Sequence, residues 1–159
     1  MNNSDSTPPK TMHPEQAIKI ASKLSSDLYD MVRLQGKVSP AGPGAATGNE
    51  KERDYAVQHF WSISQLPPKD LTRGFNRLRD ELPKKGWRVT HSGPANSTAR
   101  QLEIEAVHEK DEYSLSVELL IRSTRKDQSS HASKDDRIRF SVGSPTYRAP
   151  EGVDPDDYY

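Results

Sequence analysis

Apolar residues recur every three or four positions in two segments of the chain, which is the spacing of a helix with one buried face. The first segment begins at Pro14 and predicts a helix over residues 14–34 that stops before Gly36. The second begins at the proline pair 67–68 and stops before Gly86. We therefore expect two amphipathic helices that both contribute to a core.

Apolar and polar residues alternate in five further segments, which is the period of a half-buried strand. These segments are residues 55–63, 87–91, 102–106, 115–121 and 138–142. The last four should form an antiparallel meander, because their connections leave no room for a crossover helix. The sequence therefore predicts an α+β fold in the order α-β-α-β-β-β-β. We expect a two-layer sandwich, with two helices on the apolar face of a mostly antiparallel sheet of about five strands.

The placement of polar segments predicts one domain with flexible ends. Residues 1–12 are expected to be a disordered tether, 13–149 a single α+β domain, and 150–159 an acidic flexible tail. Residues 37–53 should form a mobile loop, because glycine, proline and alanine dominate this stretch. The residues expected to share the core are Leu24, Leu28, Trp61, Phe75, Leu78, Ile104, Val117, Leu119 and Phe140.

Composition narrows the classes of protein to consider. The apolar fraction of 31% is low, but the net charge is zero because 23 basic residues balance 23 acidic ones. Disorder usually requires a high net charge as well, so a folded domain with polar ends is favoured. The neutral balance argues against a dedicated nucleic-acid binder, and no apolar run is long enough to cross a bilayer. Because the chain has no cysteine, disulfides, thiolate metal sites and cysteine nucleophiles are excluded.

The histidines are the first candidates for chemistry, and they are His13, His59, His91, His108 and His131. None are spaced as i and i+4 on a helix, the arrangement of a helical zinc site. His59 shares a strand face with Trp61 and is a candidate buried base, although histidines in such positions are more often structural. His91 and His108 lie near strand ends and could approach each other across a hairpin, but a structural or surface role is favoured for both.

Neither the carboxylates nor the serines form a catalytic motif. Glu103 and Glu105 lie on the strand face opposite to Leu102 and Ile104, so both should point to water. The fragment 142–145 contains Gly-Ser but lacks the second glycine of a nucleophile elbow. The sequence therefore predicts no catalytic residue, no metal ligand and no cofactor, and a protein that is not an enzyme.

The second helix and the turn after it are basic. Seven basic residues and three acidic ones lie between Lys69 and Arg88. Such a run is usually a solvated helix face, and the alternative is a docking site for an anionic partner. The residues of this candidate patch are Arg73, Arg77, Lys84, Lys85 and Arg88. An envelope protein or an anionic surface would be the partner, and nucleic acid is not expected.

Two segments resemble the mature domain of small uncharacterised actinobacterial lipoproteins. They are residues 81–87, ELPKKGW, and residues 144–152, SPTYRAPEG. The resemblance implies an extracytoplasmic binding or accessory domain, tethered to the membrane through a lipid anchor. The polar start would suit the tether after a lipidated cysteine, but no cysteine is present, so Met1 would stand in its place.

A second hypothesis is that the chain is a small cytosolic interaction protein, similar to an immunity protein or a secretion chaperone. The first ten residues contain no apolar segment of a signal peptide, which fits either a cytosolic protein or a trimmed mature one. The reading frame upstream of Met1 would distinguish the two, because an apolar segment ending in a small residue and a cysteine supports the lipoprotein.

Overall fold

Two α-helices and nine strands make up the residues that a computed structural model describes, which are 8–47, 53–96, 100–122 and 136–158. Helix α1 spans Pro14–Val32 and α2 spans Pro68–Glu81. The long strands are β4 (Asp54–Ser64), β5 (Trp87–Pro94), β6 (Leu102–His108), β7 (Ser114–Leu120) and β8 (Arg137–Gly143). The short strands are β1 (Lys10–Thr11), β2 (Lys37–Val38), β3 (Gly44–Thr47) and β9 (Tyr147–Arg148). Two 3₁₀ helices are η1 (Leu82–Lys85) and η3 (Pro155–Tyr158).

The nine strands form one mixed sheet in the order β1-β9-β4-β8-β7-β6-β5, with β2 and β3 also paired to β4. The predicted α+β class and the antiparallel meander of β5 to β8 are confirmed. The prediction of about five strands was too low, and the pairing of β1 with β9 is parallel. Strands of two to four residues were missed because they are too short to show a hydrophobic period.

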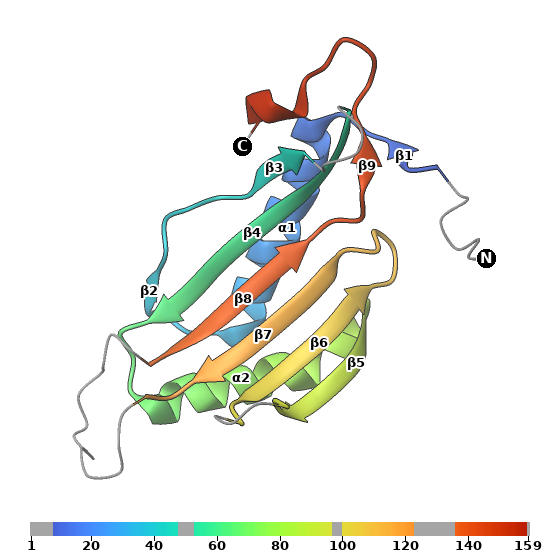
Figure 1. The fold of residues 1–159 in the computed structure, drawn as a ribbon. Helices are drawn as coiled ribbons and strands as arrows, with labels where there is room; N and C mark the ends of the chain where they lie inside the picture. Colours follow the sequence, from blue (N-terminus) through green and yellow to red (C-terminus); the bar gives the residue numbers. More distant parts are fainter. Residues whose placement is uncertain (1–7, 48–52, 97–99, 123–135, 159) are drawn as a thin grey trace.

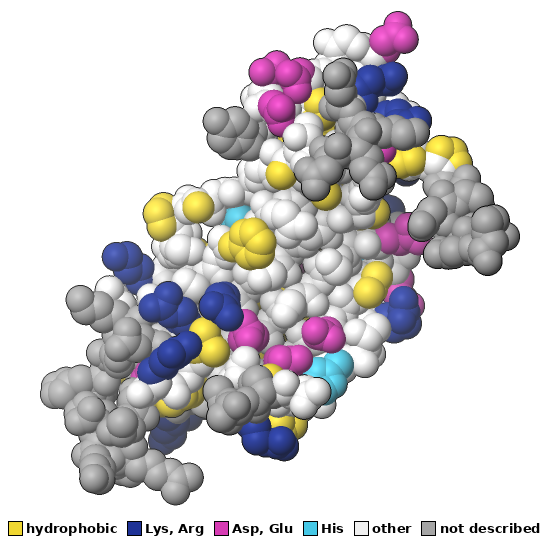
Figure 2. Space-filling model, in the orientation of Figure 1, with side chains coloured by type: hydrophobic (Ala, Val, Ile, Leu, Met, Phe, Trp, Pro, Cys, Tyr) yellow, Lys and Arg dark blue, Asp and Glu magenta, His cyan; other side chains and the backbone are white. Residues whose placement is uncertain are grey.

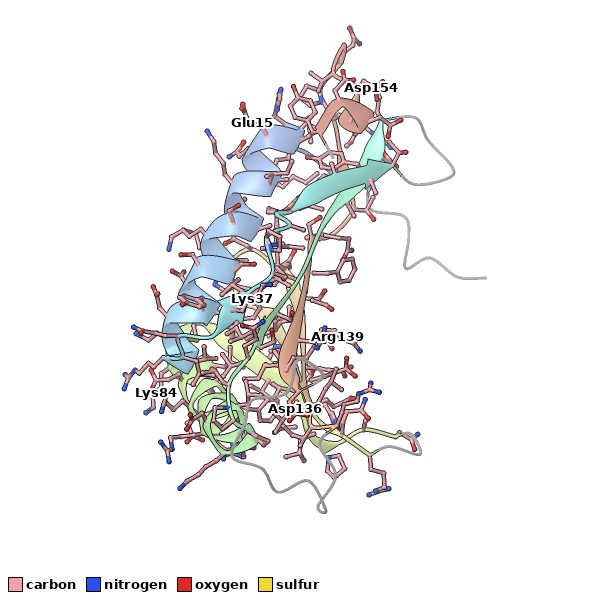
Figure 3. All side chains as sticks on the ribbon, turned by 90° about the vertical axis from the view of Figure 1, so that its left-hand side faces the viewer. Glu15, Lys37, Lys84, Asp136, Arg139 and Asp154 are labelled. Carbon is pink, nitrogen blue, oxygen red and sulfur yellow. The ribbon has the colours of Figure 1, made fainter. Side chains whose placement is uncertain are left out.

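Both helices cover the same face of the sheet, as Figures 1 and 3 show. In the edge-on view, α1 runs along the upper part of the sheet and α2 crosses below it. Helix α1 begins where the His13 side chain accepts a hydrogen bond from the Glu15 amide. It ends at Val32, earlier than predicted, because Arg33 already adopts a left-handed backbone conformation with φ of 55°.

The core lies between the helices and the sheet, and all nine residues predicted for it are buried. At its centre the rings of Trp61 and Phe140 stack with their centroids 3.9 Å apart. The buried Tyr113 hydroxyl, directly before β7, donates to the Ala17 carbonyl of α1 at 2.8 Å. The sheet therefore presents one face to the helices and leaves the other open.

The segment predicted as a loop contributes two strands instead. Within residues 37–47, β2 and β3 pair antiparallel with β4, and Ala45 is buried in the core. Gly36 permits this approach, because a Cβ atom there would lie 2.4 Å from the Ser64 carbonyl oxygen. The connection between β2 and β3 is thereby held beside β4. Residues 48–52 lie outside the described part of the chain.

The two ends of the chain also pack on the domain where they are described. In the expected tail, Pro155 is buried in η3 and Tyr158 contacts the ring of His13 edge-on. In the expected tether, β1 pairs with β9, and Tyr55 donates to the Met12 carbonyl at 2.6 Å. Residues 1–7, 97–99, 123–135 and 159 lie outside the described residues, and so does most of the polar connection predicted between the last two strands.

Candidate functional site

A pocket of about 380 Å³ opens between α1, β4 and the segment that joins β2 to β3. In Figure 1 this segment runs along one side of β4, and α1 lies behind it. We call it the α1–β4 pocket. Its lining residues are Ser22, Ser25, Ser26, Tyr29, Val38, Ser39, Ala41, Gly42, Pro43, His59 and Trp61. Four serines and three aromatic side chains therefore line one pocket. An apolar wall with a few polar groups is typical of a small-molecule site.

Three hydrogen bonds tie the floor of this pocket together. His59 Nε2 lies 2.9 Å from the Ala41 carbonyl oxygen, and because that oxygen can only accept, Nε2 carries the proton. In the neutral ring, Nδ1 then accepts from the Ser25 hydroxyl at 2.7 Å. Trp61 Nε1 donates to Ser25 Oγ at 3.1 Å. The bonds connect α1, β4 and the segment before β3 through a serine that is only 5% exposed.

Burial lowers the pKa of His59 below its usual value of 6.5, and the hydrogen bond to Ala41 opposes this shift only in part. The imidazole is therefore neutral at pH 7. A neutral ring can accept from Ser25 through Nδ1, whereas a protonated ring could only donate. The hydrogen bonds of the pocket floor and the lowered pKa thus both correspond to a neutral His59 ring.

We expect the free energy of unfolding to fall below pH 6.5 more steeply in the wild type than in His59→Gln. Unfolded histidine titrates near 6.5 and His59 titrates lower, so the unfolded state takes up its proton first as the pH falls. The stability that neutral His59 contributes is complete above 6.5 and is lost as the pH falls towards the folded pKa. Urea denaturation from pH 5 to pH 8 measures the difference. Parallel pH profiles would contradict the lowered pKa.

Local sequence explains how the pocket is assembled. The period of a strand places His59 and Trp61 on the helix side of β4. The period of a helix places Ser22, Ser25 and Ser26 on one side of α1. The sequence analysis named His59 as a candidate but did not name Ser25. The only feature of the sequence that points to Ser25 is its hydroxyl within an otherwise apolar helix face.

A second pocket, of about 350 Å³, lies where the C-terminal half of α1 meets η1 and the β5–β6 hairpin. Its lining residues are Asp27, Asp30, Met31, Arg33, Glu81, Lys85, Trp87 and His108. Opposite charges alternate there, and Asp27 and Glu81 already pair with the neighbouring Lys23 and Lys84. Because these charges offset one another, the pocket favours no single ligand chemistry, and the α1–β4 pocket is the better candidate.

His91 and His108 do not lie together in the structure. His108 lies opposite Trp87 on the helix side and contacts its ring, with centroids 4.9 Å apart. A bulge between Val89 and His91 turns His91 to the open face, 3.7 Å from Glu103. Figure 2 shows a histidine beside acidic side chains on this face. The alternative that His91 and His108 approach each other is wrong, because His108 lies opposite Trp87, away from His91, and the bulge moves His91 to the other face of the sheet. A structural or surface role stays the prediction for both.

Glu103 and Glu105 lie on this open face of the sheet, as predicted, since Ile104 between them is buried among the core residues. Figure 2 shows that side chains of both charges surround a largely uncharged centre on this face. The aromatic side chain exposed there is Phe60, at 61%.

The five predicted basic patch residues do not form one surface. Arg88 pairs with Val107 on the open face of the sheet, opposite to the buried Trp87, whereas Lys84 lies on the helix side in Figure 3. Arg73 lies 4.0 Å from Asp70, and Lys84 pairs with an acid of the preceding turn. Binding of an anionic partner along α2 stays a prediction, with Arg73, Lys84 and Lys85 as its remaining members.

Arg77 connects α2 to the end of α1. Its Nη1 donates to the carbonyls of Val32 at 2.6 Å and Arg33 at 3.2 Å. These carbonyls end α1, where helix groups need outside partners and cations are favoured. We expect Arg77→Ala to lower the free energy of unfolding by about 1–2 kcal/mol. Arg79→Ala, on the same helix but exposed, should change it by less than about 0.5 kcal/mol. Equal effects in urea denaturation would show that the contact to α1 contributes nothing.

The described residues contain neither a cluster of metal ligands nor a membrane-spanning helix. Among them, no three histidine, aspartate or glutamate side chains are grouped so that they could hold a metal ion. Neither helix in the described ranges is long and apolar enough to cross a membrane.

Comparisons of the chain with protein-family models, with curated proteins and with solved structures found no match. The geometry of the α1–β4 pocket is therefore the basis for a functional assignment.

Proposed function

We propose that this chain is a non-enzymatic binding domain that holds a small molecule in the α1–β4 pocket. The observation that carries the proposal is the hydrogen-bonded group of Ser25, His59 and Trp61 on the floor of an open pocket. Burying hydroxyl, imidazole and indole groups costs free energy unless they are paired. Here they pair with one another and with Ala41, so they hold the floor of the pocket in a fixed shape against which a ligand can pack.

The same geometry argues against a nucleophilic role for Ser25, even though a serine and a neutral histidine at 2.7 Å resemble a nucleophile and its base. Ser25 lies in the interior of α1, where backbone N–H groups are used within the helix. They cannot serve as the oxyanion donors that acyl transfer requires. We expect no labelling of Ser25 by a fluorophosphonate reagent and no hydrolysis of p-nitrophenyl acetate above that of His59→Gln.

The binding proposal is tested by ¹H–¹⁵N NMR titration of the protein with four single-ring compounds: benzyl alcohol, anisole, benzylamine and benzoate. We expect at least one of them to shift the amide signals of Ser25, Ser39 and Ala41, with a Kd in the millimolar range that about eight non-hydrogen atoms allow. The shifts should map to the lining of the pocket. If none of the four compounds shifts these signals, the proposed function is wrong.

A blocking variant separates the pocket from unspecific binding. Ser26 is exposed at the mouth of the pocket, so Ser26→Arg should obstruct it without disturbing the core. Gln16→Arg adds the same side chain to an exposed position of α1 outside the lining and serves as the matched control. The shifts should disappear in Ser26→Arg and persist in Gln16→Arg. Shifts that survive in both variants would place binding elsewhere.

The cellular location belongs to the same proposal. An extracytoplasmic domain with a lipid anchor is supported by the resemblance of residues 81–87 and 144–152 to actinobacterial lipoproteins. A codon for cysteine close upstream of the present Met1, after an apolar segment, is the expected finding. A natural start codon at Met1 would instead favour a cytosolic binding protein.

A further inference from the structure

We infer that the ligand of the α1–β4 pocket is an uncharged molecule with an apolar ring and a hydroxyl group. This inference rests on the proposed function and names the ligand class of the same pocket. Three features of the lining carry it: the absence of formal charge, the hydrogen-bonding capacity that remains unused, and the apolar wall.

The first feature is charge. Aspartate, glutamate, lysine and arginine make up 29% of the chain, yet none of them is among the eleven residues that line the pocket. His59 does not supply a charge either, because burial keeps it neutral at pH 7. A charged ligand would give up hydration on entering and meet no opposite charge in return. The lining therefore discriminates against cations and anions alike.

The second feature is the hydrogen-bonding capacity of the walls. Ser39 Oγ accepts from the Ser62 amide at 3.0 Å, so its proton is free to donate into the pocket. The Ala41 carbonyl accepts from His59 and keeps a second lone pair. The pocket thus offers both a donor and an acceptor on neighbouring residues. A hydroxyl group can satisfy both, whereas an ammonium group only donates and a carboxylate only accepts.

The third feature is the apolar part of the wall. Tyr29 contributes from α1, Val38 from β2, and Pro43 from the segment between β2 and β3. Val38 is 39% exposed, one of the large apolar side chains that the described fold leaves uncovered. A ring placed against these side chains would remove apolar surface from water, which supplies the non-directional part of the affinity.

The experiment compares four compounds built on one ring at pH 7.5. Benzyl alcohol is neutral and can donate and accept; anisole is its isomer but can only accept; benzylamine is a cation and benzoate an anion. We expect benzyl alcohol to bind about tenfold more tightly than either ion, a difference of about 1.4 kcal/mol. Anisole should bind about threefold more weakly than benzyl alcohol, because it cannot donate to the second lone pair of the Ala41 carbonyl.

A charge variant at the mouth of the pocket provides a second readout. Ser26→Asp, whose side chain is too short to obstruct the pocket, should raise the affinity for benzylamine by about threefold to tenfold relative to benzyl alcohol. Gln16→Asp, outside the lining, should leave this ratio of affinities unchanged. This gain would show that the missing charge, and not the fit of the ring, disfavours a cation in the native pocket.

The outcomes distinguish a wrong ligand class from a wrong binding function. If benzylamine or benzoate binds the wild type as tightly as benzyl alcohol, the ligand class is wrong while the binding function stands. If anisole binds as tightly as benzyl alcohol, the hydroxyl requirement is wrong. If none of the four compounds binds at the pocket, the proposed function fails together with the inference.

Discussion

Replacing Phe140 by alanine is expected to lower the free energy of unfolding by about 3–5 kcal/mol. Phe140 is fully buried on β8, a central strand between β4 and β7, and its ring is stacked within 2° of parallel on Trp61. The substitution would leave a cavity directly beneath the indole that donates to Ser25, so the floor of the α1–β4 pocket should loosen as well. Urea denaturation followed by far-UV circular dichroism measures the loss.

Phe60 provides the matched control, because it is the same residue type on the opposite face of the sheet. It lies on the neighbouring strand β4 but is 61% exposed. We expect Phe60→Ala to change the free energy of unfolding by less than about 0.5 kcal/mol, the usual range for surface substitutions. If both variants lose similar stability, the open face is not free of packing. If Phe60→Ala loses the stability and Phe140→Ala does not, the faces of β4 and β8 are assigned the wrong way round.

Leu78→Ala is the second substitution with a large expected effect, a loss of about 2–4 kcal/mol. Leu78 is fully buried on the face of α2 that packs against the sheet. Most of the stability of a helix of this length comes from tertiary packing rather than from its own hydrogen bonds, so α2 depends on such contacts. Guanidinium denaturation at an unchanged m-value would assign the loss to the folded state.

Leu102 is the corresponding control, since it is a leucine at the end of β6 that remains 38% exposed. Leu102→Ala should cost less than about 1 kcal/mol, because much of its side chain already contacts water. A loss at Leu102 equal to that at Leu78 would mean that burial does not decide the effect.

Several details of the fold depended on contacts that no local pattern reveals. The bulge after Val89 changed the face on which His91 lies, although the alternation up to that point was regular. The sequence pattern predicts that the basic residues of α2 form one helix surface. In the structure, however, Arg77 donates to two backbone carbonyls at the end of α1. Charge patterning alone cannot show which basic side chains have a backbone partner in another element.

The sequence by itself determined the two helices, the five long strands and the nine residues predicted for the core. These features follow from periods of 3.6 and 2 residues, which record locally which side chains avoid water. Only the tertiary structure decided the short strands and the pocket. Ser25 and Ala41 are 34 and 18 residues from His59 in the chain, and their meeting depends on how α1 and the segment before β3 lie against β4. Such contacts are non-local, and no periodicity within a single segment encodes them.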